Sequence, residues 1–114
     1  MNFAITDEQL EADTYLVGVE GEIDLYSAPE LKRRLAKAID SGQTRLVVDL
    51  GRATFIDSTT LGVLIAAVKR VRPVGGTLAI VCADSNITRI FELTGLDKVF
   101  PIRGSREEAI AATA

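Results

Sequence analysis

The middle of the chain carries a strand–helix–strand pattern, and this pattern limits the fold more than any other feature of the sequence. Residues 46–50 form a nearly continuous apolar run, which is typical of a strand covered on both faces. A helical segment at 58–72 follows, and residues 77–83 make another short apolar strand. Two strands joined through a helix pair in parallel with a right-handed crossover. We therefore predict that 46–50 and 77–83 are adjacent, parallel strands.

Further elements extend this unit on both sides. Residues 3–10 and 15–23 predict an antiparallel hairpin, because the second segment alternates between its two faces. Beyond the second apolar strand, the pattern predicts a third helix, an edge strand at 99–102 that contains Pro101, and a last helix. The predicted fold class is α/β: a small mixed sheet, mostly parallel with an N-terminal antiparallel hairpin, packed with about four helices in a single domain over residues 1–114.

Two Ser-x-x-Glu sequences predict where helices begin. Ser27 with Glu30, and Ser105 with Glu108, match the capping box, in which the serine oxygen accepts a hydrogen bond from the backbone N–H three residues later. The first pair precedes apolar residues at intervals of four, and the second pair precedes the last helix.

The apolar pattern also predicts which side chains fill the core. Five are expected to be largely buried: Leu50, Phe55, Leu61, Ile65 and Phe91. A loop from Gly51 is expected to bring Phe55 and Ile56 into the core beneath the start of the next helix. That helix is apolar nearly all round, because Val63, Ala66 and Ala67 lie opposite its core stripe. Such a helix is either buried or offers one side to a partner, and the pattern leaves both open.

Composition excludes several classes of function. The 114 residues include 13 Lys and Arg against 16 Asp and Glu, and the net charge of −3 disfavours nucleic-acid binding. The absence of histidine rules out Ser-His-Asp and Cys-His catalysis and zinc sites built on histidine. The one cysteine, Cys82, lies in an apolar run and is expected to be buried. We therefore expect no catalytic residue, no metal site and no cofactor, and a protein that is not an enzyme.

Signals for export or membrane insertion are also missing from the sequence. Residues 1–7 lack the basic region followed by an apolar region that begins a secretory signal. The longest apolar run ends at Lys69 and is too short to span a bilayer. We expect a cytoplasmic protein without a membrane partner.

The stretch at 55–62, which reads Phe-Ile-Asp-Ser-Thr-Thr-Leu-Gly, is the candidate functional site. It places Ser58 at the start of a helix, next to the positive end of the helix dipole. A phosphate group is tolerated there, so Ser58 is a candidate phosphate acceptor. The alternative is that Ser58 is an ordinary N-cap, which the spacing alone favours.

Four motifs that occur in order resemble a known family. They are Gly-Glu-Ile-Asp at 21–24, Leu-Val-Val-Asp-Leu at 46–50, Phe-Ile-Asp-Ser-Thr-Thr-Leu-Gly-Val-Leu at 55–64, and Arg-Ile-Phe-Glu-Leu-Thr-Gly-Leu at 89–96. Together they resemble the STAS domain, specifically a bacterial anti-sigma factor antagonist, over essentially the whole chain.

The resemblance implies a partner switch. The unmodified antagonist binds an anti-sigma factor that has serine kinase activity, and this binding frees a sigma factor. The kinase then phosphorylates the serine after the aspartate, here Ser58 after Asp57, and a metal-dependent serine phosphatase reverses the change. Asp24 matches an acidic position near the site. The family commonly has glycine where this chain has Thr60, and Thr59 remains an alternative phosphate acceptor.

The expected partner surface combines acidic residues, hydroxyl residues and the side of the helix that lies opposite its core stripe. Its members are Asp24, Asp57, Ser58, Thr59, Gly62, Val63 and Ala66. Three other interpretations compete: a STAS module with another partner, such as a stress-signalling or transport complex; a phospho-aspartate receiver that uses Asp49; and a small enzyme that uses Asp24 or Asp57 as a base.

Overall fold

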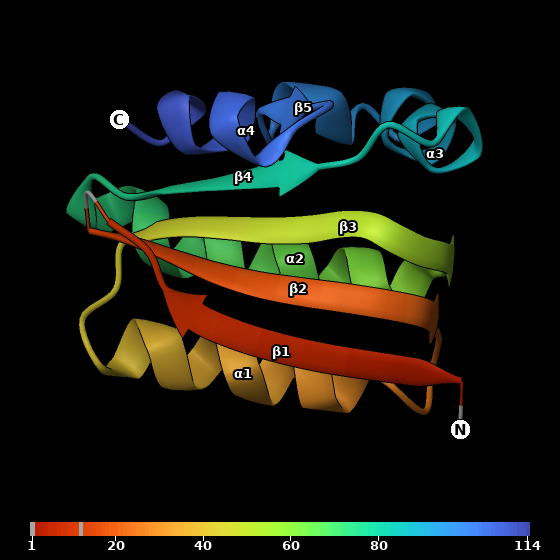
Figure 1. Ribbon diagram of the computed structural model, residues 1–114, viewed down its shortest axis with the longest axis horizontal. Helices are drawn as coiled ribbons and strands as arrows, with labels where there is room; N and C mark the ends of the chain where they lie inside the picture. Colours follow the sequence, from red (N-terminus) through yellow and green to blue (C-terminus); the bar gives the residue numbers. More distant parts are fainter. Residues whose placement is uncertain (1, 12) are drawn as a thin grey trace.

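A five-stranded mixed sheet forms the centre of the structure (Figure 1), a computed structural model that describes residues 2–11 and 13–114. In spatial order the strands are β1 (Phe3–Gln9), β2 (Thr14–Ile23), β3 (Arg45–Ile56), β4 (Thr77–Val81) and β5 (Ile102–Arg103). β1 is antiparallel to β2, and every other neighbouring pair is parallel. The predicted hairpin, the mixed sheet and the parallel pairing of the two central apolar strands are therefore confirmed.

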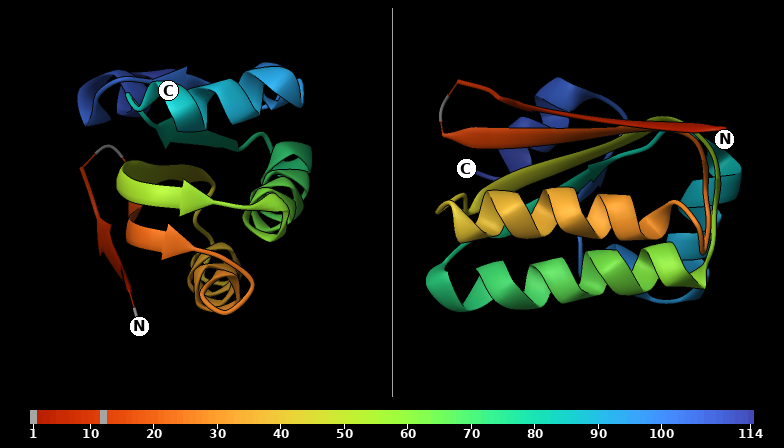
Figure 2. Two further views of the ribbon diagram at one scale, coloured as in Figure 1. Left: turned by 90° about the vertical axis from the view of Figure 1, so that its right-hand side faces the viewer. Right: turned by 90° about the horizontal axis from the view of Figure 1, so that it is seen from below.

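The helices cover the sheet unequally. α1 (Ala28–Asp40) and α2 (Ser58–Val71) pack against each other on one face, and the two axes run side by side (Figure 2). α4 (Arg106–Ala112) packs on the other face, over β3, β4 and β5, and α3 (Ser85–Leu93) lies near the carboxyl end of β4 (Figure 1). Among the described residues, no helix is long and apolar enough to cross a bilayer.

Two apolar clusters explain the continuous apolar run in β3. Leu46 and Val48 belong to the main core, and Val47 between them belongs to a smaller cluster that includes Ala109 of α4. Successive side chains of a strand point to opposite faces, so a strand covered on both faces needs apolar residues at every position.

The structure corrects the prediction for residues 51–56. β3 continues to Ile56 instead of giving way to a loop at Gly51, because it pairs with β2 as far as Ile23. Ile56 points into the core with 3% of its surface exposed, whereas Phe55 is 49% exposed. The predicted burial of Phe55 is therefore wrong. Leu50, Leu61 and Phe91 are buried as predicted, and Ile65 is half-buried against the core.

The face of α2 also differs from the prediction at one position. Ala67 is 5% exposed and belongs to the main core, although the sequence pattern placed it on the side of the helix opposite the core stripe. Val63 is half-buried and Ala66 is exposed, so the open side of the helix is narrower than the sequence suggested.

One of the two predicted capping boxes forms. At Ser105 the side-chain oxygen accepts a hydrogen bond from the Glu108 N–H at 3.2 Å, as expected. The Ser27 side chain makes no such cap for α1, and Glu30 instead binds Arg33 at 2.6 Å and Arg34 at 2.8 Å. The Ser27 hydroxyl is 3.0 Å from the carbonyl oxygen of Glu22, to which it donates. The capping box at Ser27 is therefore wrong, because the serine is drawn to the turn that precedes the helix.

Truncation of Phe91 tests this core. Phe91 is fully buried and meets Phe100 edge to face, with ring centroids 6.1 Å apart. Phe91→Ala should lower the free energy of unfolding by about 3–5 kcal/mol, because it removes a large buried ring. Chemical denaturation measures the change. Leu93→Ala, on the same helix but 74% exposed in the wild type, is the matched control and should change stability little. Equal effects of the two substitutions would contradict the assigned helix face.

Candidate functional site

Parallel pairing of β2 and β3 brings the two candidate aspartates together. Ile23 and Ile56 are register partners at the carboxyl ends of these strands, and Asp24 and Asp57 follow them directly. The chain leaves both strands at the same edge of the sheet, one into the turn before α1 and the other into α2. Residues more than thirty positions apart therefore share one site.

Asp57, and not Ser58, caps α2. The Asp57 carboxylate accepts a hydrogen bond from the Thr60 N–H at 3.1 Å, and its backbone is extended, as is usual for an N-cap. Ser58 is the first residue of the helix and is exposed. Within the described residues, no hydrogen bond occupies its side-chain hydroxyl. The alternative that Ser58 is an ordinary N-cap is therefore wrong, and its hydroxyl faces solvent at the positive end of the helix.

The two threonines that follow have different environments. Thr59 is half-buried and lines a groove, whereas Thr60 is completely buried. The Thr60 hydroxyl donates a hydrogen bond to the carbonyl oxygen of Ile23 at 3.0 Å. Of the three consecutive hydroxyl residues, only Ser58 is largely exposed to solvent.

Asp24 organises the turn between β2 and α1. Its carboxylate accepts hydrogen bonds from the N–H groups of Tyr26 at 3.0 Å and Ser27 at 3.2 Å. The Tyr26 N–H is the main reason why the pKa of Asp24 lies below its ordinary value, so the group is ionised at neutral pH. Because the folded-state pKa is depressed, the associated stability is present above the ordinary pKa of Asp and is lost as the pH falls through the folded-state value.

An apolar groove of about 380 Å³ lies next to Ser58. From α2 it is lined by Thr59, Gly62, Val63 and Ala66, four of the residues predicted to bind a partner, and from the facing turn and α1 by Leu25, Ala28, Pro29 and Lys32. Gly62 is exposed, and a side chain there would touch nothing within 4 Å, so the helix surface is open at this point. Four of the seven residues of the expected partner surface therefore line one groove, and Asp57 and Ser58 directly precede the first of them in the chain.

Three exposed hydrophobic side chains in the segments next to Asp24 and Asp57 were missed by sequence analysis. Leu25 is 63% exposed and Tyr26 is 81% exposed, both in the turn after Asp24, and Phe55 is 49% exposed two residues before Asp57. The available signal was the pair Leu25-Tyr26 itself, which stands between an acid and a Ser-Ala-Pro sequence, where a turn is expected. Large apolar side chains at such a position are candidates for contact with another protein.

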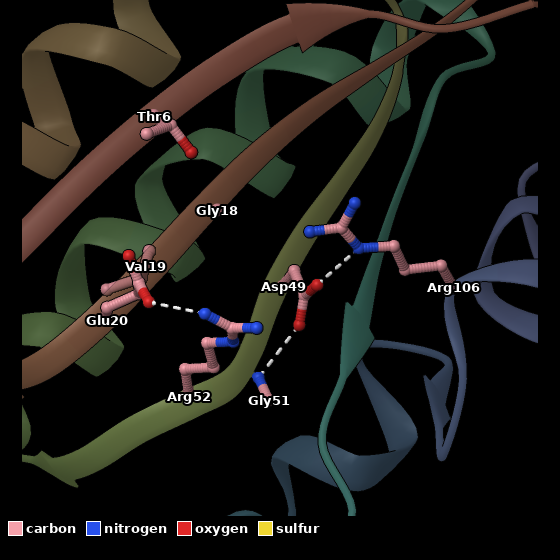
Figure 3. A pocket seen from close by; sticks show the side chains of 8 residues that line it. All are labelled: Thr6, Gly18, Val19, Glu20, Asp49, Gly51, Arg52 and Arg106. Carbon is pink, nitrogen blue, oxygen red and sulfur yellow. Dashed lines mark hydrogen bonds and ion pairs between the residues drawn. The ribbon is translucent and has the colours of Figure 1, made fainter.

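A second hollow, of about 590 Å³, lies on the sheet face opposite α1 and α2 (Figure 3). Its charged groups bind one another: Arg106 donates to Asp49 at 2.6 Å, and Arg52 donates to Glu20 at 3.2 Å. Asp49 also accepts from the Gly51 N–H at 2.8 Å. These contacts tie the start of α4 to β3 and leave little uncompensated charge for a ligand.

The position of Asp49 argues against a phospho-aspartate receiver. It lies inside β3, seven residues before the end of the strand at Ile56, and not at the edge where α2 begins. A receiver also needs a cluster of acids for magnesium, and the described residues contain no group of three or more His, Cys, Asp or Glu that could hold a metal.

Comparison with known proteins identifies the family. The family model of the STAS domain matches residues 6–109. The chain belongs to the STAS domain family. A STAS relative, the anti-sigma-B factor antagonist of Bacillus subtilis (strain 168), is 34% identical over 110 residues, which cover 96% of this chain and 99% of the relative.

Solved structures of STAS proteins have the same architecture. An anti-sigma factor antagonist from Mycobacterium paratuberculosis superimposes with a TM-score of 0.89 at 29% identity and covers 97% of this chain and 93% of its own. The Bacillus cell fate determinant SpoIIAA, in its phosphorylated form, gives a TM-score of 0.76 at 22% identity over 96% of this chain and 98% of its own. The second likeness concerns the fold alone. The predicted resemblance is thus confirmed at the level of the family.

Substitution of Asp57 tests the assigned cap. Asp57→Ala should lower the free energy of unfolding by about 0.5–2 kcal/mol, because the Thr60 N–H loses its acceptor. Asp57→Asn keeps an oxygen that can accept this hydrogen bond and should cost less, so it separates the cap from the charge. Thermal or chemical denaturation of both variants measures the difference. If Asp57→Ala were as stable as the wild type, Asp57 would not be the cap.

Proposed function

We propose that this chain is an anti-sigma factor antagonist whose binding is switched by phosphorylation of Ser58. The unmodified form binds an anti-sigma factor with serine kinase activity in the bacterial cytoplasm and thereby frees a sigma factor. Phosphorylation of Ser58 ends this binding, and a metal-dependent serine phosphatase restores it. In this proposal residues 1–114 act as a single STAS domain that works by binding and is not itself an enzyme.

The exposed hydroxyl of Ser58 at the first position of α2 carries the proposal. It is accessible to a kinase, while Asp57 supplies the cap, so modification of Ser58 does not remove a hydrogen bond that holds the helix. The names of relatives at 32–34% identity support the antagonist part of the proposal, since those relatives are named anti-sigma-B factor antagonists.

The charge of a phosphate explains how modification would change binding. A phosphoserine carries about −1.5 to −2 charges and three strong acceptor oxygens. On Ser58 it would lie close to Asp57 and Asp24, and the combined negative charge would repel an acidic partner surface. The bulk of the phosphate group would also crowd the groove. The unpaired N–H groups and the dipole at the start of α2 favour a negative charge, so the fold would be retained.

The proposed docking surface includes the seven residues predicted from the sequence together with the exposed apolar side chains around them. The predicted members are Asp24, Asp57, Ser58, Thr59, Gly62, Val63 and Ala66. Leu25 and Tyr26 supply the large apolar and aromatic groups that dominate the energy of many interfaces. Phosphorylation would thus add its charge at the edge of an apolar contact.

Substitution at Ser58 tests the switch. Ser58→Ala should bind the kinase-type anti-sigma factor but accept no phosphate, so the antagonist stays active. Ser58→Asp places one negative charge where phosphate places nearly two, and should weaken binding by about tenfold, which corresponds to about 1.4 kcal/mol. Radiolabel transfer and titration calorimetry measure the two effects.

Thr59→Ala is the matched control for this experiment. It removes the neighbouring hydroxyl and should still be phosphorylated at the wild-type rate. Labelling of Ser58→Ala at the wild-type rate would move the acceptor to Thr59. Tighter binding of the phosphorylated form would overturn the mechanism even if Ser58 were the acceptor.

A charge placed in the groove tests the docking surface. Val63→Asp should weaken binding to the anti-sigma factor by about tenfold or more, because a carboxylate would be buried against an apolar partner surface. Val74→Asp is the matched control, since Val74 is 68% exposed beyond the far end of α2. Circular dichroism checks that both variants are folded. Unchanged affinity of a folded Val63→Asp variant would remove this side of α2 from the interface.

A further inference from the structure

We propose that Thr60 is a positioning residue that fixes the turn after Asp24 relative to the start of α2. Through this contact, the two segments that carry the proposed partner-binding groups are held in one arrangement. The inference rests on the proposed function for its effect on binding, but its structural part can be tested without a partner.

The contact is buried and joins two distant parts of the chain. Thr60 has no exposed surface, and its hydroxyl donates to the carbonyl oxygen of Ile23, 37 residues earlier, at 3.0 Å. Its backbone N–H donates to the Asp57 carboxylate at 3.1 Å, and its hydroxyl oxygen is 3.2 Å from the same carboxylate. One residue therefore contacts both the end of β2 and the cap of α2.

The position of the Ile23 carbonyl determines how the turn after β2 is oriented. It belongs to the peptide unit that joins Ile23 to Asp24, and the Asp24 N–H donates to the Ser27 hydroxyl at 2.8 Å. The Asp24 carboxylate in turn accepts from Tyr26 and Ser27. A fixed Ile23–Asp24 peptide thus sets the direction of the turn that carries Leu25 and Tyr26, the most exposed apolar side chains near the groove.

The same contact affects what a phosphate on Ser58 can do. A hydroxyl has one proton, and the nearer of its two acceptors is the Ile23 carbonyl at 3.0 Å, with the Asp57 carboxylate at 3.2 Å. The third residue of α2 therefore has a contact with the sheet that does not require the Asp57 side chain. If repulsion by a phosphate displaced the Asp57 carboxylate from the Thr60 N–H, the contact between Thr60 and Ile23 would still hold the start of the helix in place. The switch would then change the charge of the docking surface without moving its parts.

Amide hydrogen exchange of the isolated protein tests the structural claim. In Thr60→Val, which keeps the shape but lacks the hydroxyl, the Tyr26 and Ser27 amides should exchange roughly three- to tenfold faster, as expected for the loss of one hydrogen bond. Thr60→Ser keeps the hydroxyl and should restore slow exchange. If Thr60→Val does not fold, Thr60→Ala replaces it.

Thr113→Val is the matched control. Thr113 is 4% exposed, and its hydroxyl donates to the carbonyl oxygen of Ile110 at 2.7 Å, at the end of α4. This variant also loses a buried hydroxyl, but it should leave exchange at Tyr26 and Ser27 unchanged. Equal exchange in Thr60→Val and wild type, or the same acceleration in Thr113→Val, would overturn the inference.

Affinity for the kinase-type anti-sigma factor tests the functional claim. Thr60→Val should bind several-fold more weakly than wild type, Thr60→Ser should recover most of the affinity, and Thr113→Val should bind normally. If wild type does not bind, the proposed function fails, and the exchange experiment still decides whether Thr60 orders the turn. If wild type and Thr60→Val bind equally, Thr60 has no positioning role in recognition.

Discussion

The pairing of β2 with β3 is the interaction on which the rest of the structure depends. It is parallel, it runs from Thr14 and Arg45 to Ile23 and Ile56, and it makes both strands end at one edge of the sheet. The turn after β2 and the start of α2 meet there because their strands are paired, although neither segment is near the other in sequence. Packing of α1 against α2 on the same face then completes the groove between them.

Much of the fold could be predicted from the sequence because it is encoded in local patterns. Apolar runs, helical spacing and turn residues located the strands and helices, and the strand–helix–strand order implied parallel pairing. The side chain of Phe55 could not be placed this way. Its direction depends on how β3 pairs with β2, and that pairing shifts register at Gly18/Glu20 and at Gly21/Glu22. Such shifts change which face a residue occupies and leave no periodic signal.

The sequence was enough to predict which residues belong to the candidate site, but less so the role of each residue. Asp24, Asp57 and Ser58 could be named from motifs, but four residues able to cap a helix stand in a row at 57–60, and local sequence does not choose among them. In the structure the Asp57 carboxylate accepts from the Thr60 N–H, while the Thr60 hydroxyl is directed to β2 by a tertiary contact that the local sequence does not show. Ser27 is a similar case, since its hydroxyl binds the strand end and not the helix it precedes.

The placement of α4 on the face opposite α1 and α2 has a practical consequence for handling the protein. The chain ends after α4 at the edge of the sheet away from the start of α2, whereas the first residues of β1 lie at the same edge as Ser58 (Figure 1). A fluorophore, an affinity handle or a surface anchor attached at Ala114 would therefore leave the groove accessible, while the same attachment before β1 would stand beside it. Immobilisation through the last residue presents the groove outward.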